Sequence, residues 1–377
     1  MITLTTAGES HGKGLFAIIE GVPKGLKLDL EKIDRALCRR QSGYGRGARQ
    51  KIENDSVEIL SGVRNLTTLG SPITLAVWNR DFENWKDIMA PEGCDTGKRK
   101  VENVRPGHAD LAGMKKFQLT DAREVLERAS ARETAVRVAA GEVFRQLLAA
   151  LNIEVTGYVR SVAASADSAT YSFDEIQQGR SDALCMLDRE VEAQAKREID
   201  GAKTEGDTLG GVIEVRVKGL KSGFGSPMTY REKLDARLAG ALMSVQAIKG
   251  VEVGGGFALA TVKGSGAHDE ICFENGAFIR KSNRAGGIEG GMSNGEELVL
   301  RAAMKPIPTL TRGLNTVNFN TKEQAKAAAE RSDVCAVPAC EVVCESAILC
   351  ELAKAVCERL GGDTLDQLKK RYEELAP

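Results

Sequence analysis

Hydrophobic and polar residues follow two rhythms along the chain. Short apolar runs, or apolar residues alternating with polar ones, predict strands at 16–20, 57–60, 73–78, 155–162 and 211–217. Apolar residues repeated every three or four positions predict helices at 30–40, 131–151, 231–248 and 338–360. Asp29 is placed to cap the first helix, and Gly361 and Gly362 to end the last. The segment 298–304 fits a strand or a helix, and the polar run 188–208 fits an exposed helix or a mobile insert.

The order of these elements determines the expected fold class. Strands and helices are mixed without a regular strand–helix–strand alternation, which favours an α+β fold over a doubly wound parallel sheet. No Pro- or Ser-rich linker and no low-complexity segment divides the chain. We therefore expect a single domain over residues 1–377.

Composition and charge narrow the class of protein. Of 377 residues, 42% are apolar, enough for a sizeable core, and the net charge of −1 is no signature of polyanion binding. The chain has no apolar run of about 18 residues and no leader-like amino terminus, so we expect a cytoplasmic protein without a membrane span. The nine cysteines form no CxxC pair and are expected as reduced, buried thiols. Cys340 and Cys344 are one helical turn apart but have no histidine nearby in sequence, so no metal site is predicted.

Only three histidines occur, and two of them lie in tight segments rich in glycine or proline. His11 is in Gly8-Glu-Ser-His-Gly12, and His108 is in Arg105-Pro-Gly-His-Ala109. Histidine titrates near neutral pH, and glycine lets the backbone approach a ligand closely. The two settings indicate acid/base chemistry, although two satisfied loop histidines explain them equally well. The third, His268, is expected at the surface.

Two cationic segments are candidate anion sites. Residues 39–51 hold five cations and no acid, interleaved with glycines, which suits phosphate or carboxylate recognition. A single aromatic residue in this segment, together with the balanced overall charge, argues against nucleic acid. In the second segment, 123–134, Ser130 is placed to cap the following helix, and that helix start also suits an anion.

Two further segments give weaker signals. The glycine-rich run 286–295, followed by Lys305 and Thr309, fits a phosphate-binding loop or ordinary hairpin turns. Asp333 precedes the last predicted helix, where a lone aspartate is usually a cap.

Taken in order, these segments resemble the chorismate synthase family over the whole chain. Each motif alone is weak, but the ordered set is specific. The matching segments are 8–12, 20–23, 39–47, 59–64, 70–73, 79–81 with Trp85, 105–110, 128–132, 286–291, 305–306 and 331–333.

The resemblance implies a reaction, a cofactor and an assembly. Members of the family convert 5-enolpyruvylshikimate 3-phosphate to chorismate and phosphate by a 1,4-anti elimination, the last step of the shikimate pathway. The reaction needs reduced FMN without net redox change. The expected fold is a layered β-α-β sandwich of antiparallel sheets and helices, and the expected assembly is a homotetramer.

The resemblance also implies residue roles. His11 would protonate or stabilise the leaving phosphate, His108 would manage the proton on reduced flavin, and Asp333 would act with flavin N5 in removing the C6 hydrogen. Substrate would be bound by Ser10, Arg40, Arg46, Arg49 and Arg132. The flavin site would be formed by Arg128, Ala129, Ser130, Gln246, Ala247, Gly290, Lys305, Pro306, Ile307, Pro308, Thr309 and Arg331.

Two alternative functions are less well supported. A Ser/His or Cys/His hydrolase is disfavoured because Ser10 and His11 are sequence neighbours and no G-x-S-x-G motif is present. A polyanion-binding protein that uses residues 39–51 would not need two glycine-flanked histidines. The source of reduced flavin stays open, although an external flavin reductase is favoured because no insertion suggests a separate domain for a nicotinamide cofactor such as NADP.

Overall fold

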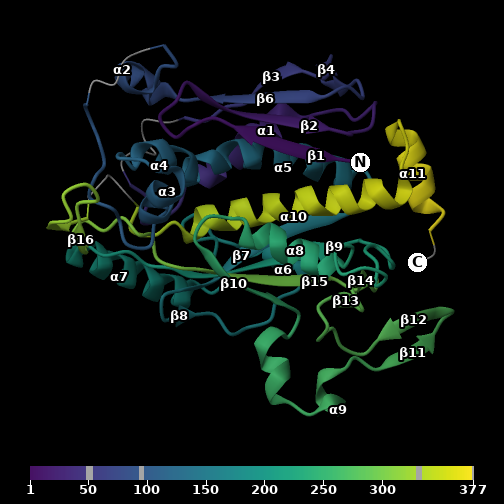
Figure 1. Ribbon diagram of the computed structural model, residues 1–377. Coiled ribbons are helices and arrows are strands. Elements are labelled where there is room, and N and C mark those ends of the chain that lie inside the picture. Colours follow the sequence, from purple (N-terminus) through teal and green to yellow (C-terminus); the bar gives the residue numbers. More distant parts are fainter. Residues whose placement is uncertain (48–53, 93–96, 328–332, 376–377) are drawn as a thin grey trace.

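Two antiparallel sheets enclose a layer of helices (Figure 1). The computed structural model describes residues 1–47, 54–92, 97–327 and 333–375. The strand order is β1-β2-β6-β3 in the first sheet and β10-β15-β9-β7-β8 in the second. The α+β class and the layered β-α-β arrangement expected from the sequence are confirmed.

The first sheet buries one face and exposes the other. In β2, Leu15, Ala17 and Ile19 are fully buried, whereas Ile18 between them is 44% exposed. This alternation is what an antiparallel sheet with one face on the core requires. Its strands are β1 (Thr3–Ala7), β2 (Gly14–Glu20), β3 (Glu58–Ser61) and β6 (Ile73–Trp78).

The second sheet resolves the ambiguous segment 298–304. This segment forms β15, which pairs with β10 on one side and β9 on the other. A central strand is buried over most of its length, so its apolar run has no helix- or strand-like period to distinguish it. The strands of this sheet are β7 (Glu154–Val162), β8 (Ser165–Ala166), β9 (Gly211–Lys218), β10 (Ile248–Val253) and β15 (Leu298–Met304).

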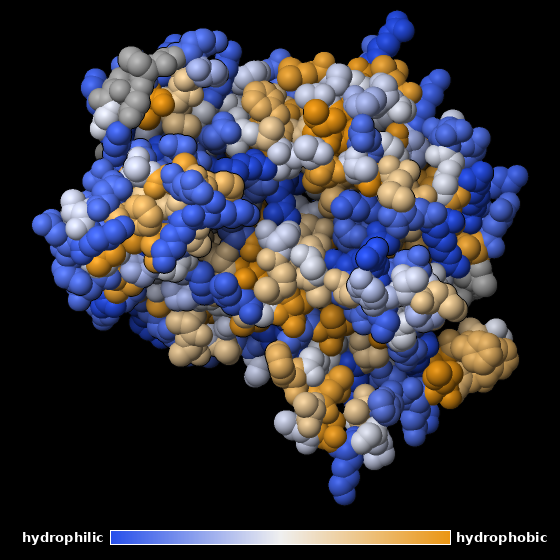
Figure 2. Space-filling view, viewed as in Figure 1, coloured by the Kyte–Doolittle hydropathy of each residue, from blue (hydrophilic) through white to orange (hydrophobic). Residues whose placement is uncertain are grey.

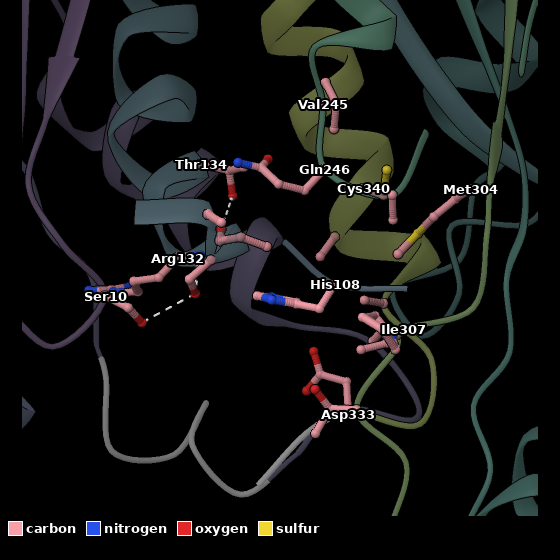
Figure 3. A pocket seen from close by; sticks show the side chains of 18 of the residues that line it. Ser10, His108, Arg132, Thr134, Val245, Gln246, Met304, Ile307, Asp333 and Cys340 are labelled. Atoms are coloured by element: carbon pink, nitrogen blue, oxygen red, sulfur yellow. Dashed lines mark hydrogen bonds between the residues drawn. The ribbon is translucent and has the colours of Figure 1, made fainter. Parts of the chain in front are cut away.

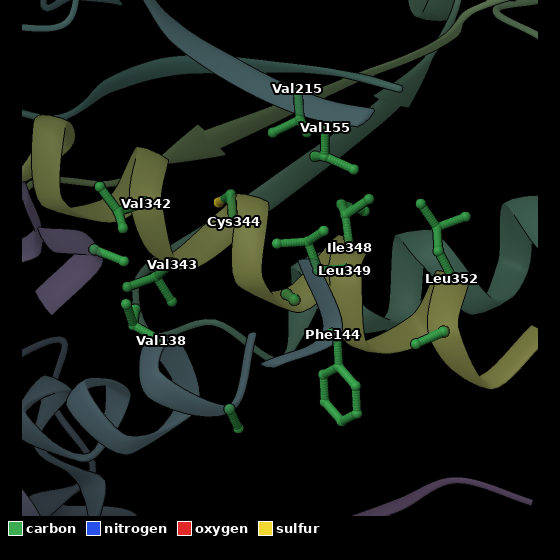
Figure 4. Packing of buried hydrophobic residues seen from close by; sticks show 14 of the residues in the cluster. Val138, Phe144, Val155, Val215, Val342, Val343, Cys344, Ile348, Leu349 and Leu352 are labelled. Carbon is green, nitrogen blue, oxygen red and sulfur yellow. The ribbon is translucent and has the colours of Figure 1, made fainter. Parts of the chain in front are cut away.

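Three helices form the middle layer: α1 (Leu30–Gln41), α5 (Thr134–Ala149) and α10 (Val337–Leu360). Helix α8 (Leu234–Met243) lies beside this layer. Asp29 caps α1 by accepting a hydrogen bond from Lys32 N, as the sequence predicts. Helix α10 is buried along its length, with Val343 toward α5 and Ile348 toward the second sheet (Figure 4). One continuous apolar core joins both sheets through these helices.

The remaining elements surround this sandwich. The polar run 188–208 forms helix α7, with Asp188 as its cap, so the helical alternative is correct. Among the described helices, none is long and apolar enough to cross a membrane. The other elements are β4 (Val63–Arg64), β5 (Thr67–Thr68), η2 (Arg80–Asn84), α2 (Lys86–Met89), α3 (Asp110–Phe117), α4 (Arg123–Ala129), η3 (Ala131–Glu133), α6 (Phe173–Gly179), α7 (Arg189–Glu205), η4 (Gly256–Thr261), α9 (Gly264–Ala267), β11 (Ile271–Glu274), β12 (Ala277–Arg280), β13 (Ile288–Glu289), β14 (Met292–Ser293), β16 (Asn315–Val317), β17 (Gln324–Lys326) and α11 (Leu365–Glu373).

The helix predicted at 231–248 is shorter than expected. Helix α8 ends at Met243, Ala247 has a φ of 70°, and a strand begins at Ile248. The strand is favoured because Ile248 pairs with Met304 and the Ala247 carbonyl accepts a hydrogen bond from Lys305 N at 2.9 Å. Sheet pairing therefore overrides the helical pattern.

Helices α5 and α10 cross without room for a side chain at Gly141. A Cβ atom there would lie 2.5 Å from the Cβ of Ser346, closer than two carbon atoms can pack. The glycine therefore sets the separation of the two central helices.

We expect Gly141→Ala to lower the free energy of unfolding by about 1–3 kcal/mol, the usual cost of overpacking a core. Gly201→Ala is the matched control because Gly201 lies in exposed helix α7 with nothing within 4 Å of its added Cβ. That change should raise stability by about 0.5–1 kcal/mol. Urea unfolding measures both, and an unchanged or higher stability for Gly141→Ala would contradict the packing argument.

Candidate active site

A cavity of about 390 Å³ opens where the amino-terminal ends of α5 and α10 meet. Its walls come from segments far apart in sequence (Figure 3). The predicted site residues that line it are Ser10, His11, Arg40, Arg46, His108, Ala129, Ser130, Arg132, Gln246, Ala247, Lys305, Ile307, Pro308, Thr309 and Asp333.

A few predicted residues are placed elsewhere. Arg128 is exposed and donates to the Gly8 and Thr6 carbonyls, and Pro306 is not part of the cavity wall. Gly290 is in the turn of the β13–β14 hairpin, on the right in Figure 1, away from the amino-terminal end of α10. Arg49 and Arg331 lie outside the described residues.

His11 is held in a tight loop between β1 and β2. Gly8 has a φ of 105°, and a Cβ there would lie 2.3 Å from the Gly14 carbonyl oxygen, so the turn requires glycine. The Nδ1 atom of His11 is 2.9 and 3.0 Å from the two carboxylate oxygens of Glu127. Burial alone would raise the pKa of Glu127, but hydrogen bonds from His11 and Arg123 outweigh it and the pKa falls below its usual value.

His108 has a similar arrangement just before helix α3. Its Nδ1 atom makes a short contact with the Asp110 carboxylate, which also accepts hydrogen bonds from Arg105 Nε and a terminal nitrogen at 2.8 and 3.0 Å. Asp110 is fully buried. Burial opposes ionisation, yet the hydrogen bonds from His108 and Arg105 hold the pKa of Asp110 well below its usual range.

Two of the predicted substrate arginines share one buried carboxylate. Asp55 Oδ2 accepts from Arg40 at 2.9 Å and from Arg132 at 2.6 Å. Arg132 also donates from Nε to Asn79 Oδ1 at 3.0 Å. Burial lowers the pKa of Arg40 to about 10, with Asp55 opposing, so the guanidinium stays charged at neutral pH. The cluster therefore carries a net positive charge inside the protein.

Asp333 is not a helix cap. The cap position of α10 is Ala336, and Asp333 instead accepts a hydrogen bond from Gly47 N at 2.6 Å and pairs with Arg46 at 3.4 Å. The capping interpretation of Asp333 is therefore wrong, because the carboxylate instead contacts Arg46 and Gly47, which line the cavity. Figure 3 shows Asp333 and His108 bordering the same open space.

Arg39, next to Arg40 in sequence, faces away from the cavity. It donates to Glu341 and Glu345 on α10 at 2.9 and 3.1 Å. Consecutive residues of a helix point about 100° apart, so only one of the two arginines can face the cavity. The basic segment therefore divides into a structural part and a part that faces the cavity.

The opposite side of the cavity is mostly apolar. Its apolar lining residues are Leu126, Val245, Met304, Ile307, Ala336, Ala339, Cys340 and Val343. Among the described residues, the buried side-chain oxygen of Gln246 and the buried Nε atoms of Arg40 and Arg46 have no hydrogen-bond partner. A buried polar atom without a hydrogen-bond partner lowers the stability of the fold, and a ligand that supplies the partner removes this cost. Gln246, Lys305 and Thr309 add polar groups to this lining, and such a mixture is typical of sites for small organic ligands.

Several residues that shape the site were not predicted from sequence. Asp55, Asn79, Glu127 and Arg105 hold the lining side chains through the contacts described above. Arg123 and Glu127 are spaced to pair on a helix, and they do, at 3.0 Å. No local signal could place Glu127 beside His11, because the two are 116 residues apart.

Comparison with known proteins identifies the family. A family model described as chorismate synthase matches residues 2–357. The chain belongs to the chorismate synthase family.

Curated relatives cover nearly the whole chain. The chorismate synthase of Geobacter sulfurreducens is 50% identical over 99% of this chain and 98% of its own length. That of Alkaliphilus metalliredigens is 50% identical over 99% of both chains, and that of Pelobacter propionicus is 53% identical over 99% and 98%. A solved structure titled "Crystal Structure of Chorismate Synthase" superimposes with a TM-score of 0.79 at 38% identity, covering 99% of this chain and 96% of that one.

Proposed function

We propose that this chain is a lyase that removes phosphate from 5-enolpyruvylshikimate 3-phosphate to give chorismate, the last step of the shikimate pathway. The C3–phosphate bond and the C6–H bond break in a 1,4-anti elimination, so the products are chorismate, phosphate and a proton. The observation that carries the proposal is one cavity that brings three of the predicted substrate arginines and two carboxylate-paired histidines together. Membership of the chorismate synthase family selects this reaction among those such a cavity could support.

Substrate binding rests on the buried cations. The substrate carries a phosphate and two carboxylates, and Arg40, Arg46 and Arg132 supply planar groups that bind such anions in pairs of hydrogen bonds. Asp55 and Asp333 offset part of the arginine charge in the free protein. The remaining positive charge favours an anion beside these buried side chains more than it would in water.

Reduced FMN is the proposed cofactor. Gln246, Ala247, Lys305 and Thr309 would hold it against the apolar wall, with the orphaned Gln246 oxygen as an acceptor for a ring N–H group. Its bound reduced ring would supply electron density while phosphate leaves, and would recover that density as the C6 hydrogen departs.

Three side chains would move or hold protons. His11 would donate a proton to the leaving phosphate, His108 would hold the proton of the reduced flavin, and Asp333 would accept the proton that leaves C6. A positioned acid or base contributes about a hundred- to ten-thousandfold in rate. Ser10, which accepts a hydrogen bond from Ser130 at 3.2 Å, would orient the substrate beside His11.

The proposed assembly is a cytoplasmic homotetramer supplied with reduced flavin by an external reductase. Exposed apolar side chains support association between copies. Phe273 and Phe278 on the β11–β12 hairpin are 62% and 75% exposed, and Phe257 nearby in sequence is 76% exposed. Figure 2 shows apolar side chains gathered at this hairpin, at the lower right.

The decisive test is an anaerobic assay with 5-enolpyruvylshikimate 3-phosphate, FMN and dithionite. Chorismate should form in large molar excess over flavin, because the cofactor is not consumed. Oxidised FMN should give no product. Equal turnover with oxidised FMN, or one product per reduced flavin, would refute the proposed role of the cofactor.

The histidines give a second test. His11→Ala and His108→Ala should each lower kcat by about a hundredfold or more while FMN still binds. His268→Ala is the control, since His268 is exposed and outside the cavity. A comparable loss in the control would show that the assignment to cavity histidines is mistaken.

Substitution of two arginines of the basic segment should have different effects. Arg46→Gln should weaken substrate binding by about 1.5–3 kcal/mol, or ten- to a hundredfold, because an anion loses a charged partner. Arg39→Gln should lower the free energy of unfolding by a similar 1.5–3 kcal/mol, or less with solvent screening, and leave binding intact. Calorimetry and urea unfolding measure both, and the reverse pattern would overturn the division between ligand-facing and structural arginines.

A further inference from the structure

We propose that Glu127 and Asp110 are positioning residues that hold one proton of His11 and of His108 on Nδ1, so that each imidazole gains and loses its second proton at Nε2. This inference rests on the proposed function, in which both histidines act in the cavity. It adds two positioning residues to that proposal and names Nε2 as the reactive nitrogen of each histidine. Each histidine belongs to a three-member chain, imidazole to carboxylate to arginine.

Glu127 contacts His11 at two points. Its carboxylate accepts from the backbone N of His11 at 2.8 Å and lies 2.9 Å from the ring Nδ1. Its side chain is 1% exposed, and Arg123 donates to Oε1 of the same carboxylate at 3.0 Å. The carboxylate therefore cannot rotate away without losing several charged hydrogen bonds.

Aromatic stacking fixes the His11 ring plane. Trp85 lies 3.8 Å from the His11 ring centroid at an interplanar angle of 21°. The guanidinium groups of Arg99 and Arg123 lie 4.1 and 5.1 Å from the Trp85 ring centroid. With its plane set by Trp85 and its Nδ1 set by Glu127, the ring has one orientation.

Asp110 likewise contacts Nδ1 of His108, but from a position close to it in sequence. The carboxylate is two residues away in sequence, in the first turn of α3, and is held by Arg105 through its side chain and its backbone N at 3.1 Å. The His108 imidazole projects into the cavity in Figure 3. Two unrelated segments thus build the same three-member chain.

The carboxylates decide which ring nitrogen bears the proton. An ionised carboxylate only accepts hydrogen bonds, so the Nδ1 facing it must be the donor. Both carboxyl groups have a pKa below the usual range and stay ionised at neutral pH. Arg105 also lies 3.2 Å from His108 Nδ1, but the closer Asp110 contact determines the direction of donation.

Among the described residues, few other charged groups are near the two rings. Arg123 and, beyond Trp85, Arg99 are near His11; Arg105 is near His108, and Lys305 donates to the Gly107 carbonyl at 3.1 Å. The remaining charged residues that line the cavity are Arg40, Arg46, Arg132 and Asp333. In this cationic surrounding, each carboxylate is the anionic group that contacts its histidine ring, so its removal should favour the neutral imidazole.

The test uses the full chain labelled with ¹⁵N-histidine, with and without reduced FMN. Three histidines give three resolvable sets of signals, and His268 is the internal reference. His11 and His108 should both show a protonated Nδ1 when neutral. A neutral ring with its proton on Nε2 would overturn the proposal, whatever the activity of the enzyme.

Variants connect the tautomer to the rate. Glu127→Gln should alter the signals of His11 alone, and Asp110→Asn those of His108 alone, because an amide can also donate to Nδ1 and permits the other tautomer. Each should lower kcat about ten- to a hundredfold with little change in KM, by analogy with residues that orient metal-bound histidines. The midpoint of the pH–rate profile should move to lower pH, and Glu127→Asp should restore part of the rate.

Glu214→Gln is the matched control, since Glu214 is a fully buried carboxylate paired with Arg216 and Arg301 outside the cavity. It should lower stability without changing histidine signals or the pH profile. Unchanged histidine signals in Glu127→Gln and Asp110→Asn would refute the positioning role. If the wild-type enzyme made no chorismate, the proposed function would fail while the tautomer measurement still decided this inference.

Discussion

The close crossing of α5 and α10 is the constraint on which the rest of the structure depends. Because Gly141 has no side chain, its backbone can lie directly against Ser346, and the two helices approach closely. The first sheet packs on α5 and the second on α10, so this crossing sets the distance between the two sheets. The cavity opens at the amino-terminal ends of the same helices, with Thr134 on one and Cys340 on the other. A change in the crossing would therefore alter core packing and cavity width together.

The second organising feature is the compensation of buried charge. Arginines near the cavity are dehydrated, which is unfavourable unless each finds an anion. Asp55 serves two of them, Asp333 serves Arg46, and Glu127 and Asp110 pair with an arginine and a histidine each. Compensation is incomplete around Arg40 and Arg46, whose buried Nε atoms lack partners among the described residues. Under the proposed function, the same incompleteness that costs stability would favour the binding of an anionic substrate.

Local signals predicted the fold well, and long-range contacts limited the rest. Asp29 and the apolar repeat after it located α1, and the strand at 73–78 has the bounds expected. The helix at 231–248 was overestimated because only the pairing of Ile248 with β15 reveals that a strand begins there. Glycine-flanked His11 and His108 pointed to the cavity, whereas Asp55 and Glu127 carry no sequence signature of their own. Their roles come from partners brought near by folding.

The cavity also depends on the chain being almost completely folded. The hydrogen bond from Gly47 to Asp333 joins residues 286 positions apart, and the contact of His11 with Glu127 spans 116. Contacts of such separation form slowly, because the entropy of closing long loops is lost before the contacts stabilise the fold. During synthesis, Arg46 near the amino terminus can form its ion pair only after Asp333 has been made. Ligands that bind this cavity thus recognise the finished protein, and the nascent chain is without their protection until its last central helix has docked.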